Sequence, residues 1–362
     1  MKILHISRQF YPCIGGTEKY IYEVAKRLIK NGFKNYVLTL NYNIFNKQQK
    51  FCKSEEIDGI IIYRVPGFGY YKKPIPLEIP LKLFKEVDIV HLHDIRFFFE
   101  IAIFLKNIYK YKLIYSTHGF LFHTTDFAFL KKLIIPVYYK PLIKRFIDVI
   151  VCVSQQDYEY FKELKNNVYL IENGIDYEKF SRIKREPIDG EFLYFGRIDK
   201  NKGLDILFNV LSKMKDLKWH LNIVGEGFDE VVNSLKNLAK NLGIDDRVIW
   251  WGFLSEEKLF ELISKAHICF FPSTYEGFGF TLVEAMAAGC ICVANKIKAY
   301  SSIILDNYNG FLVDFRDIEK TVSKIKKILK SSSSEISRQA KLYAIKYSWE
   351  EKIKMIESLY IS

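Results

Sequence analysis

The sequence lacks the features of disulfide-linked secreted proteins and of membrane-spanning proteins. Its six cysteines form no CxxC pair and no compact framework, so we expect them to be reduced and mostly buried in apolar strands. No stretch reaches the about 18 uninterrupted apolar residues of a spanning helix. No charged leader followed by an apolar core precedes the first strand-like run. These absences predict a cytoplasmic protein that is either soluble or peripheral on the inner face of the cell membrane.

The composition and the length predict a globular chain of two domains. Of the 362 residues, 49% are hydrophobic and 27% are charged, which excludes disordered and fibrous classes. A chain of this length exceeds what one hydrophobic core usually serves. We therefore expect one domain over residues 1–178 and a second over residues 179–346, joined by a polar linker that runs from Asn173 to Gly190.

Apolar strand-like runs alternate with amphipathic helices, which predicts an α/β fold with parallel sheets covered on both faces. The pattern restarts in the second half, and residues 317–361 have a helical pattern. Two doubly wound, Rossmann-like domains would form a cleft at the carboxyl ends of their strands, where such sheets bind ligands. The runs are 3–7, 36–40, 60–65, 89–93, 113–117, 149–154 and 168–171, then 192–195, 220–224, 248–251, 268–271, 291–294 and 311–313.

The stretch from Ser273 to Gly289 places two carboxylates eight positions apart across a glycine-rich loop and a helix start. The glycines at 277 and 279 let the backbone approach a ligand, and Thr281 is expected to cap the helix. Glu284 is then expected in the first helical turn, with Glu276 just before it. A helix N-terminus attracts phosphate, and carboxylates accept paired O–H groups. The pattern is typical of a sugar-nucleotide site, although first-turn glutamates and loop glycines are also common without a ligand.

Three further loops follow strand-like runs, where an open parallel sheet carries its chemistry. Gly15 and Gly16 open a helix near Thr17, so their backbone amides are candidates for phosphate contact, and a tight turn is the alternative. Arg197 and Lys202 flank a helix start and are candidates for clamping a pyrophosphate. Lys200, between them, has the pattern of a solvated residue. His118 follows a strand and can bond a sugar hydroxyl or a backbone carbonyl.

His91 and His93 alternate on one strand and therefore share a face, which raises a metal site as an alternative. We do not favour it, because the sequence shows no third and fourth ligand. His5, His220 and His267 occupy strand contexts and are expected to be core or edge residues, whereas His123 is undecided.

Taken together, these residues resemble the family 4 (group 1) glycosyltransferases, which have the two-domain GT-B fold. The resemblance spans nearly the whole chain and includes a final helix, about 347–362, that returns to the first domain. Its short motifs are specific through their order and spacing. They are Gly15-Gly16, Thr117-His118-Gly119, Val153-Ser154, Glu172 to Asp176, Gly196-Arg197 with Lys202-Gly203, Val224 to Gly227, and the pair Glu276 and Glu284.

The resemblance implies a role for each matching residue. Glu276 would contact hydroxyls of the donor sugar, Glu284 would hold the nucleotide ribose, and His118 would lie beside the transferred sugar. Arg197 and Lys202 would neutralise the diphosphate. The nucleobase would lie near the loop that contains Phe253. Backbone at Gly15, Gly16, Phe278, Gly279, Phe280 and Thr281 would support the phosphates.

The resemblance also implies the reaction: a hexosyl group moves from a nucleoside diphosphate sugar to an acceptor hydroxyl, with retention at the anomeric carbon, in glycan, glycolipid or polysaccharide synthesis. No tightly bound cofactor and no metal are required. A GT-B sugar-nucleotide epimerase and a noncatalytic sugar-nucleotide-binding protein remain alternatives. The chain departs from the family pattern in two places, because Ile291 occupies a position that is often proline and residues 295–300 replace a glycine loop.

The positive charge is concentrated in the first half of the chain. Residues 1–180 contain 27 Lys and Arg against 18 Asp and Glu, out of 54 and 42 in the whole chain. This excess favours an anionic, glycan-bearing or lipid-linked acceptor, or an anionic membrane surface. The segment 106–145, which mixes Lys131, Lys132, Lys140 and Lys144 with aromatic and aliphatic residues, is the candidate membrane contact, with a buried helix pair as the alternative. Nucleic acid is not an expected partner, because no known binding module is present.

Overall fold

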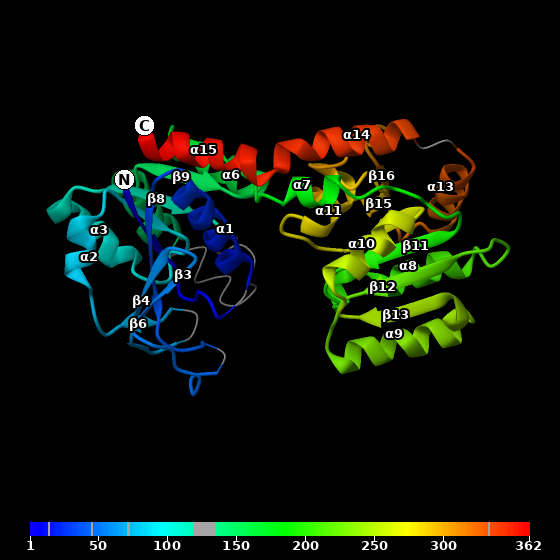
Figure 1. The fold of residues 1–362 in the computed structure, drawn as a ribbon, viewed down its shortest axis with the longest axis horizontal. Coiled ribbons are helices and arrows are strands. Elements are labelled where there is room, and N and C mark those ends of the chain that lie inside the picture. Colours follow the sequence, from blue (N-terminus) through cyan, green and yellow to red (C-terminus); the bar gives the residue numbers. More distant parts are fainter. Residues whose placement is uncertain (14, 45, 71–72, 119–134, 332–333) are drawn as a thin grey trace. The chain divides into compact units, whose positions relative to one another are not determined.

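The computed structural model of the chain describes all residues except 14, 45, 71–72, 119–134 and 332–333. It divides into two compact units, one formed by Met1–Asn173 with Trp349–Ser362 and the other by Gly174–Ser348. Each unit contains a mostly parallel sheet with helices packed against it, which confirms the predicted α/β class (Figure 1). Among the described residues, no helix combines the length and the apolar character needed to cross a bilayer.

The sheet of the first unit has the order β10-β9-β8-β7-β1-β2-β4-β3. Its central strands are short, largely apolar and buried on both faces, as expected of parallel strands covered by helices, whereas the edge strands β3 and β10 are partly exposed. His5 of β1 lies opposite Val37 of β2 and His91 of β7. The strands are β1 (Lys2–Ile6), β2 (Lys34–Leu40), β3 (Ser54–Ile57), β4 (Ile60–Val65), β7 (Ile89–Leu92), β8 (Lys112–Ser116), β9 (Val149–Cys152) and β10 (Val168–Leu170), and β5 (Gly67–Phe68) and β6 (Ile75–Pro76) form a separate hairpin.

Amphipathic helices cover this sheet. In α1 the residues Tyr20, Ile21, Val24, Ala25 and Leu28 share one buried face, spaced as a helix requires. The chain returns to this unit through α15, whose Trp349, Ile353 and Ile356 belong to the same core, and α15 lies beside α1 (Figure 1). The helices are α1 (Gly16–Lys30), α2 (Leu81–Glu86), α3 (Phe99–Tyr109), the π-helix η2 (Ile135–Tyr139), α5 (Lys140–Phe146), α6 (Gln155–Lys162) and α15 (Trp349–Ile361).

The sheet of the second unit has the order β13-β12-β11-β14-β15-β16, and its recorded strand pairs are parallel. Buried side chains on both faces form its core. The strands are β11 (Glu191–Phe195), β12 (His220–Val224), β13 (Val248–Gly252), β14 (Ile268–Phe271), β15 (Ile291–Asn295) and β16 (Phe311–Val313). The helices are α7 (Tyr177–Ser181), η3 (Lys200–Lys202), α8 (Leu204–Ser212), α9 (Asp229–Asn241), η4 (Asp245–Arg247), α10 (Glu256–Lys265), α11 (Phe280–Ala287), α12 (Lys298–Ser301), α13 (Ile318–Lys330), α14 (Ser334–Ala344) and η5 (Ile345–Tyr347).

Two local expectations were wrong. The stretch expected to be a linker is bound to the second unit, because Ile175 N donates to Tyr347 O at 2.8 Å, Glu186 N donates to Ser264 O at 2.9 Å, and the Arg185 guanidinium donates to two backbone carbonyls. The first sheet is also not wholly parallel, since β3 pairs antiparallel with β4. The polar sequence of β3 suits a sheet edge, where charged residues discourage further pairing.

The cysteines are free, as expected, but they are not uniformly buried. Cys152, Cys269, Cys290 and Cys292 are buried, whereas Cys52 is exposed and Cys13 is half-buried. The expectation that the cysteines are mostly buried is therefore confirmed, with Cys13 and Cys52 as the exceptions.

Candidate functional site

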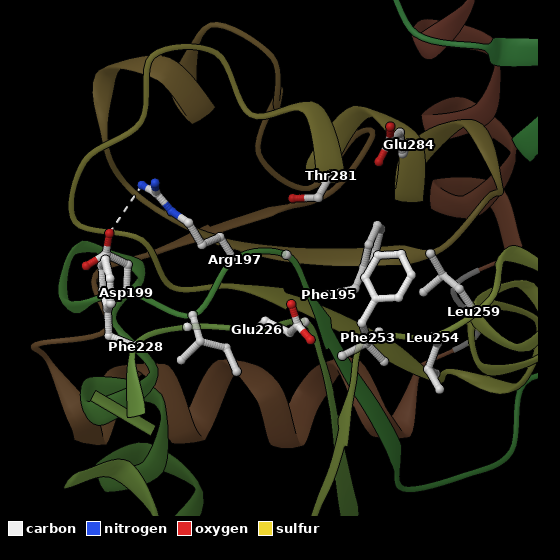
Figure 2. A pocket seen from close by; sticks show the side chains of 15 residues that line it. Phe195, Arg197, Asp199, Glu226, Phe228, Phe253, Leu254, Leu259, Thr281 and Glu284 are labelled. Atoms are coloured by element: carbon white, nitrogen blue, oxygen red, sulfur yellow. Dashed lines mark ion pairs between the residues drawn. The ribbon is translucent and has the colours of Figure 1, made fainter. Parts of the chain in front are cut away.

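A pocket of about 680 Å³ lies at the carboxyl ends of three neighbouring strands of the second unit, β11, β12 and β13. Helix α11 contributes Thr281 and Glu284 to it, and helix α10 contributes Leu259 (Figure 2). In this sheet the order reverses at β11, which has β12 on one side and β14 on the other, and ligands of such sheets bind at that point. The lining residues are Phe195, Gly196, Arg197, Ile198, Asp199, Val224, Gly225, Glu226, Gly227, Phe228, Phe253, Leu254, Leu259, Thr281 and Glu284.

Glycines allow two loops of this pocket to lie against each other. Gly196 has a φ of +144° and Gly225 a φ of +134°, values that side-chain-bearing residues rarely adopt. A Cβ atom on Gly225 would lie 2.0 Å from the carbonyl oxygen of Gly196. The loops after β11 and β12 therefore keep a bare backbone floor that a phosphate or sugar can approach closely.

One end of the pocket is polar. Arg197 has a side chain that is 70% exposed, and its Nη2 lies 3.2 Å from Asp199 Oδ2. Figure 2 shows this pair at one end of the pocket, with the Thr281 hydroxyl between it and Glu284. An exposed guanidinium held by a single carboxylate can still reorient toward an incoming anion.

The other end is apolar. Figure 2 shows Phe253, Leu254 and Leu259 grouped together, away from Arg197. Phe253 follows β13 and is 80% exposed, so its ring can stack on a flat aromatic group without rearranging the core. Figure 2 shows the Glu284 carboxylate next to Thr281, and the Glu226 carboxylate between Arg197 and Phe253.

The expected position of the helix start was wrong. Helix α11 begins at Phe280 and has Gly279 as its N-cap, so Thr281 is inside the first turn rather than capping it. Glu284 accordingly lies in the second turn, not in the first. Gly279 supplies a φ of +109° at this junction, which a threonine could not adopt without strain. Because Thr281 does not cap the helix, its hydroxyl is turned to the pocket instead.

Glu276 lies in a polar cluster beside the pocket. Its Oε1 atom accepts hydrogen bonds from Lys202 Nζ at 2.5 Å, from Ser273 Oγ at 3.0 Å and from the Tyr300 hydroxyl at 3.3 Å. The Lys202 and Glu276 side chains are 16% and 17% exposed. Sequence reasoning paired Lys202 with Arg197 as a clamp, whereas in this structure the Lys202 ammonium contacts Glu276. The three contacts converge on one carboxylate oxygen, which fixes the orientation of the group.

Tyr300 is a member of this cluster that sequence reasoning missed. Burial raises the pKa of its hydroxyl well above the usual value, and the nearby Glu276 charge adds to this, so the hydroxyl is a donor at neutral pH. A Cβ on Gly279 would lie 2.8 Å from Tyr300 Cε1, so the tyrosine ring also fixes the loop before α11. In the sequence, the only indication of Tyr300 is that residues 295–300 replace the glycine loop of the family pattern.

The remaining candidates of the second unit are structural neighbours of the pocket. Phe278 is buried and Phe280 is half-buried, and their rings meet edge to face at 5.1 Å. They hold the loop between Glu276 and α11 by packing. In this structure they do not line the pocket.

Gly15, Gly16 and His118 belong to the first unit. Helix α1 begins at Gly16 with Gly15 as N-cap, a residue with no side chain to occupy the first N–H groups. His118 follows β8, is half-buried, and its Nε2 lies 2.9 Å from His93 Nδ1.

The reason given against a metal site at His91 and His93 was wrong, because His5 supplies a third imidazole with ring nitrogens within 4.8 Å. The hydrogen bonds give a different reason. His91 Nδ1 lies 2.5 Å from the Tyr360 hydroxyl and His91 Nε2 lies 2.7 Å from Ser116 Oγ, so both of its nitrogens are engaged. His5 Nδ1 lies 3.0 Å from His93 Nε2, a distance typical of one shared proton. The expectation that the reaction requires no metal stays a prediction.

Two arginines at the reversal point of the first sheet were also missed. Arg8 follows β1 and its Nε donates to Asp94 Oδ2 at 2.8 Å, while Arg96 Nε donates to Asp94 Oδ1 at 2.7 Å. Their side chains are 17% and 31% exposed. Two guanidinium groups thus lie around the Asp94 carboxylate at the end of β1, where a ligand of this sheet would bind, and the Glu18 carboxylate also acts on Arg8.

Comparison with known proteins connects these features to a family. Residues 176–347 match the family model described as Glycosyl transferases group 1, and residues 14–179 match the model described as Glycosyltransferase Family 4. A relative from Xanthomonas campestris, named GDP-mannose:cellobiosyl-diphosphopolyprenol alpha-mannosyltransferase, is 28% identical over 357 residues, covering 96% of this chain and 93% of its own.

Solved structures share the fold. A glycosyltransferase from Rickettsia africae aligns with a TM-score of 0.77 at 20% identity, over 99% of this chain and 97% of its own. The Anabaena protein HepE, solved in complex with UDP-glucose, aligns with a TM-score of 0.74 at 19% identity, over 99% of both chains. These are GT-B structures. The chain therefore belongs to the family 4 (group 1) glycosyltransferases and is a glycosyltransferase of the GT-B fold.

Proposed function

We propose that this enzyme transfers a hexosyl group from a nucleoside diphosphate sugar to an acceptor hydroxyl with retention of anomeric configuration. The observation that carries the proposal is the order of groups along the pocket: an exposed aromatic ring at Phe253, a carboxylate at Glu284, a hydroxyl at Thr281 and a guanidinium at Arg197. This order matches base, ribose and diphosphate. A base stacks on an aromatic face, a ribose donates its hydroxyls to a carboxylate, and phosphates bind a guanidinium and a helix N-terminus.

In this proposal Arg197, Lys202 and the N-terminus of α11 stabilise the diphosphate as it leaves. Preorganised positive groups at a site of growing negative charge commonly supply the largest share of catalysis. Glu276 contacts the donor sugar and favours the positive charge that develops on its ring. In this proposal the acceptor hydroxyl attacks the anomeric carbon directly, on the face that the diphosphate leaves, and a donor phosphate oxygen accepts its proton.

The identity of the donor is open between two nucleotides. The Xanthomonas relative is named for GDP-mannose, and the Anabaena structure holds UDP-glucose. We propose GDP-mannose as the first donor to test, because the relative named for it aligns along nearly the whole chain at the higher identity.

The experiment is a thermal-shift screen of the purified protein against UDP and GDP sugars, followed by transfer assays with the donors that bind. A donor present at 100 times its Kd stabilises the folded protein by about 2.7 kcal/mol. Product formed from an α-linked donor is then examined by proton NMR of the new anomeric centre. An α-linkage is the expected outcome, and a β-linkage overturns retention. Conversion of the donor sugar without acceptor indicates the epimerase, and binding without either reaction indicates a noncatalytic protein.

We further propose that the acceptor is anionic and lipid-linked. Arg8 and Arg96 place two guanidinium groups at the end of β1, and guanidinium groups are suited to bind an acceptor phosphate. The Xanthomonas relative is named for a diphosphopolyprenol acceptor. Residues 119–134 of the basic segment 106–145 lie outside the described residues, so that candidate membrane contact stays a prediction.

The structure adds another candidate membrane contact, the hairpin of β5 and β6. Four large apolar side chains of this region, at Phe68, Tyr70, Ile75 and Leu77, are each more than half exposed. We call them the apolar hairpin patch. Large exposed apolar groups rimmed by charge are typical of interaction surfaces. Two lysines contact the hairpin region, since Lys47 Nζ donates to Gly69 O at 3.4 Å and Lys53 pairs with Glu78 at 2.9 Å. A third, Lys73, lies between β5 and β6 and pairs with Glu100 of α3 at 2.7 Å.

The membrane contact is tested by cosedimentation with anionic and neutral vesicles at low and high salt. Binding to anionic vesicles that weakens with salt is expected. A Phe68→Ser, Ile75→Ser, Leu77→Ser triple variant should lose vesicle binding and keep transfer to a soluble sugar. Its matched control replaces the exposed Ile249, Leu305 and Leu342 of the second unit by serine. Equal losses in both variants, or no binding by the wild type at low salt, overturn the hairpin assignment.

A further inference from the structure

Four side chains from separate strands and loops form one continuous hydrogen-bonded row in the first unit. Asn35 Oδ1 lies 3.0 Å from His5 Nε2, His5 Nδ1 lies 3.0 Å from His93 Nε2, and His93 Nδ1 lies 2.9 Å from His118 Nε2. Asn35, His5 and His93 are buried and His118 is half-buried at the end of the row. We call this row the histidine relay.

The relay has one direction, because its inner end is anchored by a group that can only accept. Asn35 Nδ2 donates to the backbone carbonyl of Phe33 at 3.3 Å. The amide oxygen of Asn35 therefore faces His5, and a carbonyl oxygen can only accept, so His5 carries its proton on Nε2. A neutral imidazole has one N–H, so His5 Nδ1 accepts from His93 Nε2.

Because each neutral imidazole has one N–H, the same donor and acceptor order extends along the relay to His118 at its outer end. His93 Nδ1 is then an acceptor, and the proton in the last contact belongs to His118 Nε2. The Nδ1 atom of His118 consequently keeps its lone pair. Within the described part of the chain, no hydrogen bond to this Nδ1 is recorded. Tyr20 holds the ring from the side, with centroids 4.6 Å apart in an edge-to-face contact.

The rings of the relay stay neutral near pH 7. Burial lowers the pKa of His5 and of His118 to about 4, and it lowers the pKa of His93 well below the usual value. A charge on one ring would also repel charge on its neighbours, since the centroids of His93 and His118 are 5.1 Å apart. The single-proton rule of a neutral ring therefore applies along the whole relay.

We propose that Asn35, His5 and His93 are positioning residues that fix the tautomer of His118, with its proton on Nε2 and a lone pair on Nδ1 that can accept a hydrogen bond. This inference rests on the proposed function for the effect on kcat, and on the relay alone for the protonation pattern.

The first test measures where the protons are, without any substrate. Long-range 1H–15N NMR spectra of protein labelled with 15N-histidine distinguish protonated from unprotonated ring nitrogens. We expect His5, His93 and His118 to carry protons on Nε2 and to keep this pattern from pH 8 to pH 6. A through-hydrogen-bond coupling between His93 Nδ1 and His118 Nε2 is also expected. A proton on Nδ1 of any of the three, or titration in this range, overturns the relay in the wild-type protein.

The second test separates positioning from packing with two variants of His93. Glutamine retains a donor and an acceptor at about the positions of the imidazole nitrogens, whereas phenylalanine retains a ring and removes both. His93→Gln should keep the proton of His118 on Nε2. Its kcat should be within about threefold of the wild-type value, a change that corresponds to only part of the free energy of one hydrogen bond. In His93→Phe the proton of His118 should be distributed between Nδ1 and Nε2. This variant should also lower kcat roughly tenfold or more, as loss of one such hydrogen bond predicts.

The outcomes of these tests are distinguishable. If no nucleotide sugar is turned over, the proposed function fails while the NMR pattern still decides the relay. If both His93 variants fold, as judged by circular dichroism, and have equal kcat, the positioning role is overturned even where transfer is robust. If His93→Phe does not fold, Asn35→Leu removes the inner acceptor, and an unchanged His118 pattern in that variant overturns the relay.

Discussion

Replacing Lys202 by methionine tests the polar cluster around Glu276. The change retains the aliphatic stem and removes the ammonium that lies 2.5 Å from Glu276 Oε1. Both side chains are less than one fifth exposed, so solvent replaces the lost contact incompletely. A hydrogen bond to a charged group contributes about 1.5–3 kcal/mol, and partial exposure places this pair at the lower end, about 1–2 kcal/mol. For a domain of this size the melting temperature of the second unit should fall by about 2–8 °C.

The effect on turnover should be larger than the effect on stability. Lys202 is proposed both to stabilise the departing diphosphate and to orient Glu276, and loss of one preorganised group of this kind commonly lowers kcat by roughly 10²-fold. The assay is the initial rate at saturating donor, which reports turnover and not donor binding. Glu276→Gln should lower kcat as well. The double variant should be little worse than the poorer single variant, because residues in one contact are not additive.

The matched control is Lys200→Met, which removes a lysine from the same short helix η3. Lys200 is exposed, whereas Lys202 is half-buried, so the control should change kcat and melting temperature little. Near-native kcat in Lys202→Met, or an equal loss in both variants, refutes the reasoning. Independent losses in the double variant refute the coupling to Glu276 while leaving a role for each residue.

Further predictions concern the two glutamates, Tyr300 and the buried histidines. Glu276→Gln should fold normally and transfer poorly, whereas Glu284→Gln should weaken nucleotide binding in a titration with UDP or GDP; the reverse pattern exchanges the two roles. Tyr300→Phe removes one donor to Glu276 and should lower kcat by roughly tenfold or less, with a fall in melting temperature no larger than that of Lys202→Met, and an unaltered kcat contradicts its positioning role. Acidification should destabilise the first unit, because burial lowers the pKa of His5 from 6.5 to about 4 and only the unfolded chain binds this proton just below pH 6.5. The free energy of unfolding of this unit is therefore unaffected by the ring above pH 6.5 and decreases as the pH falls toward 4. At pH 5 the decrease due to His5 is about 2 kcal/mol. Urea midpoints at pH 7.5 and 5 measure it, and an unchanged midpoint for this unit is the contrary result.

Much of the fold could be predicted because its parallel strands are apolar on both faces. Such strands are continuous hydrophobic runs, which stand out between amphipathic helices. β3 was missed for the converse reason: Ser54-Glu55-Glu56-Ile57 carries the polar residues of an edge and has no hydrophobic run. The supposed linker was misinterpreted because its polar residues bind backbone. Arg185, for example, donates to backbone carbonyls at the end of α10, and the hydrophobic periodicity of the sequence cannot predict such a contact.

The site was predictable where function depends on position along a strand, and not where it depends on contacts across the fold. Arg197 follows its strand directly, so its place at the pocket could be predicted from sequence. Tyr300 is 24 positions from Glu276 and meets it only because α12 follows β15, the strand next to β14. The helix start was misplaced by two residues because threonine is a good N-cap in sequence statistics, whereas the backbone found at the true N-cap, Gly279, favours glycine.

The two sheets concentrate polar groups at equivalent places, and the reason is topological. In each sheet the first strand becomes central, because later strands add to both of its sides: β2 and β7 flank β1, and β12 and β14 flank β11. Loops that leave the end of such a strand diverge to opposite faces and leave a crevice. Arg8 follows β1 and Arg197 follows β11, so each unit places a guanidinium at its crevice. The strand order that makes these places equivalent is a property of the fold. Short sequence motifs could therefore indicate that the arginines matter, whereas only the strand pairing shows why His5, on β1, meets His93, just beyond β7.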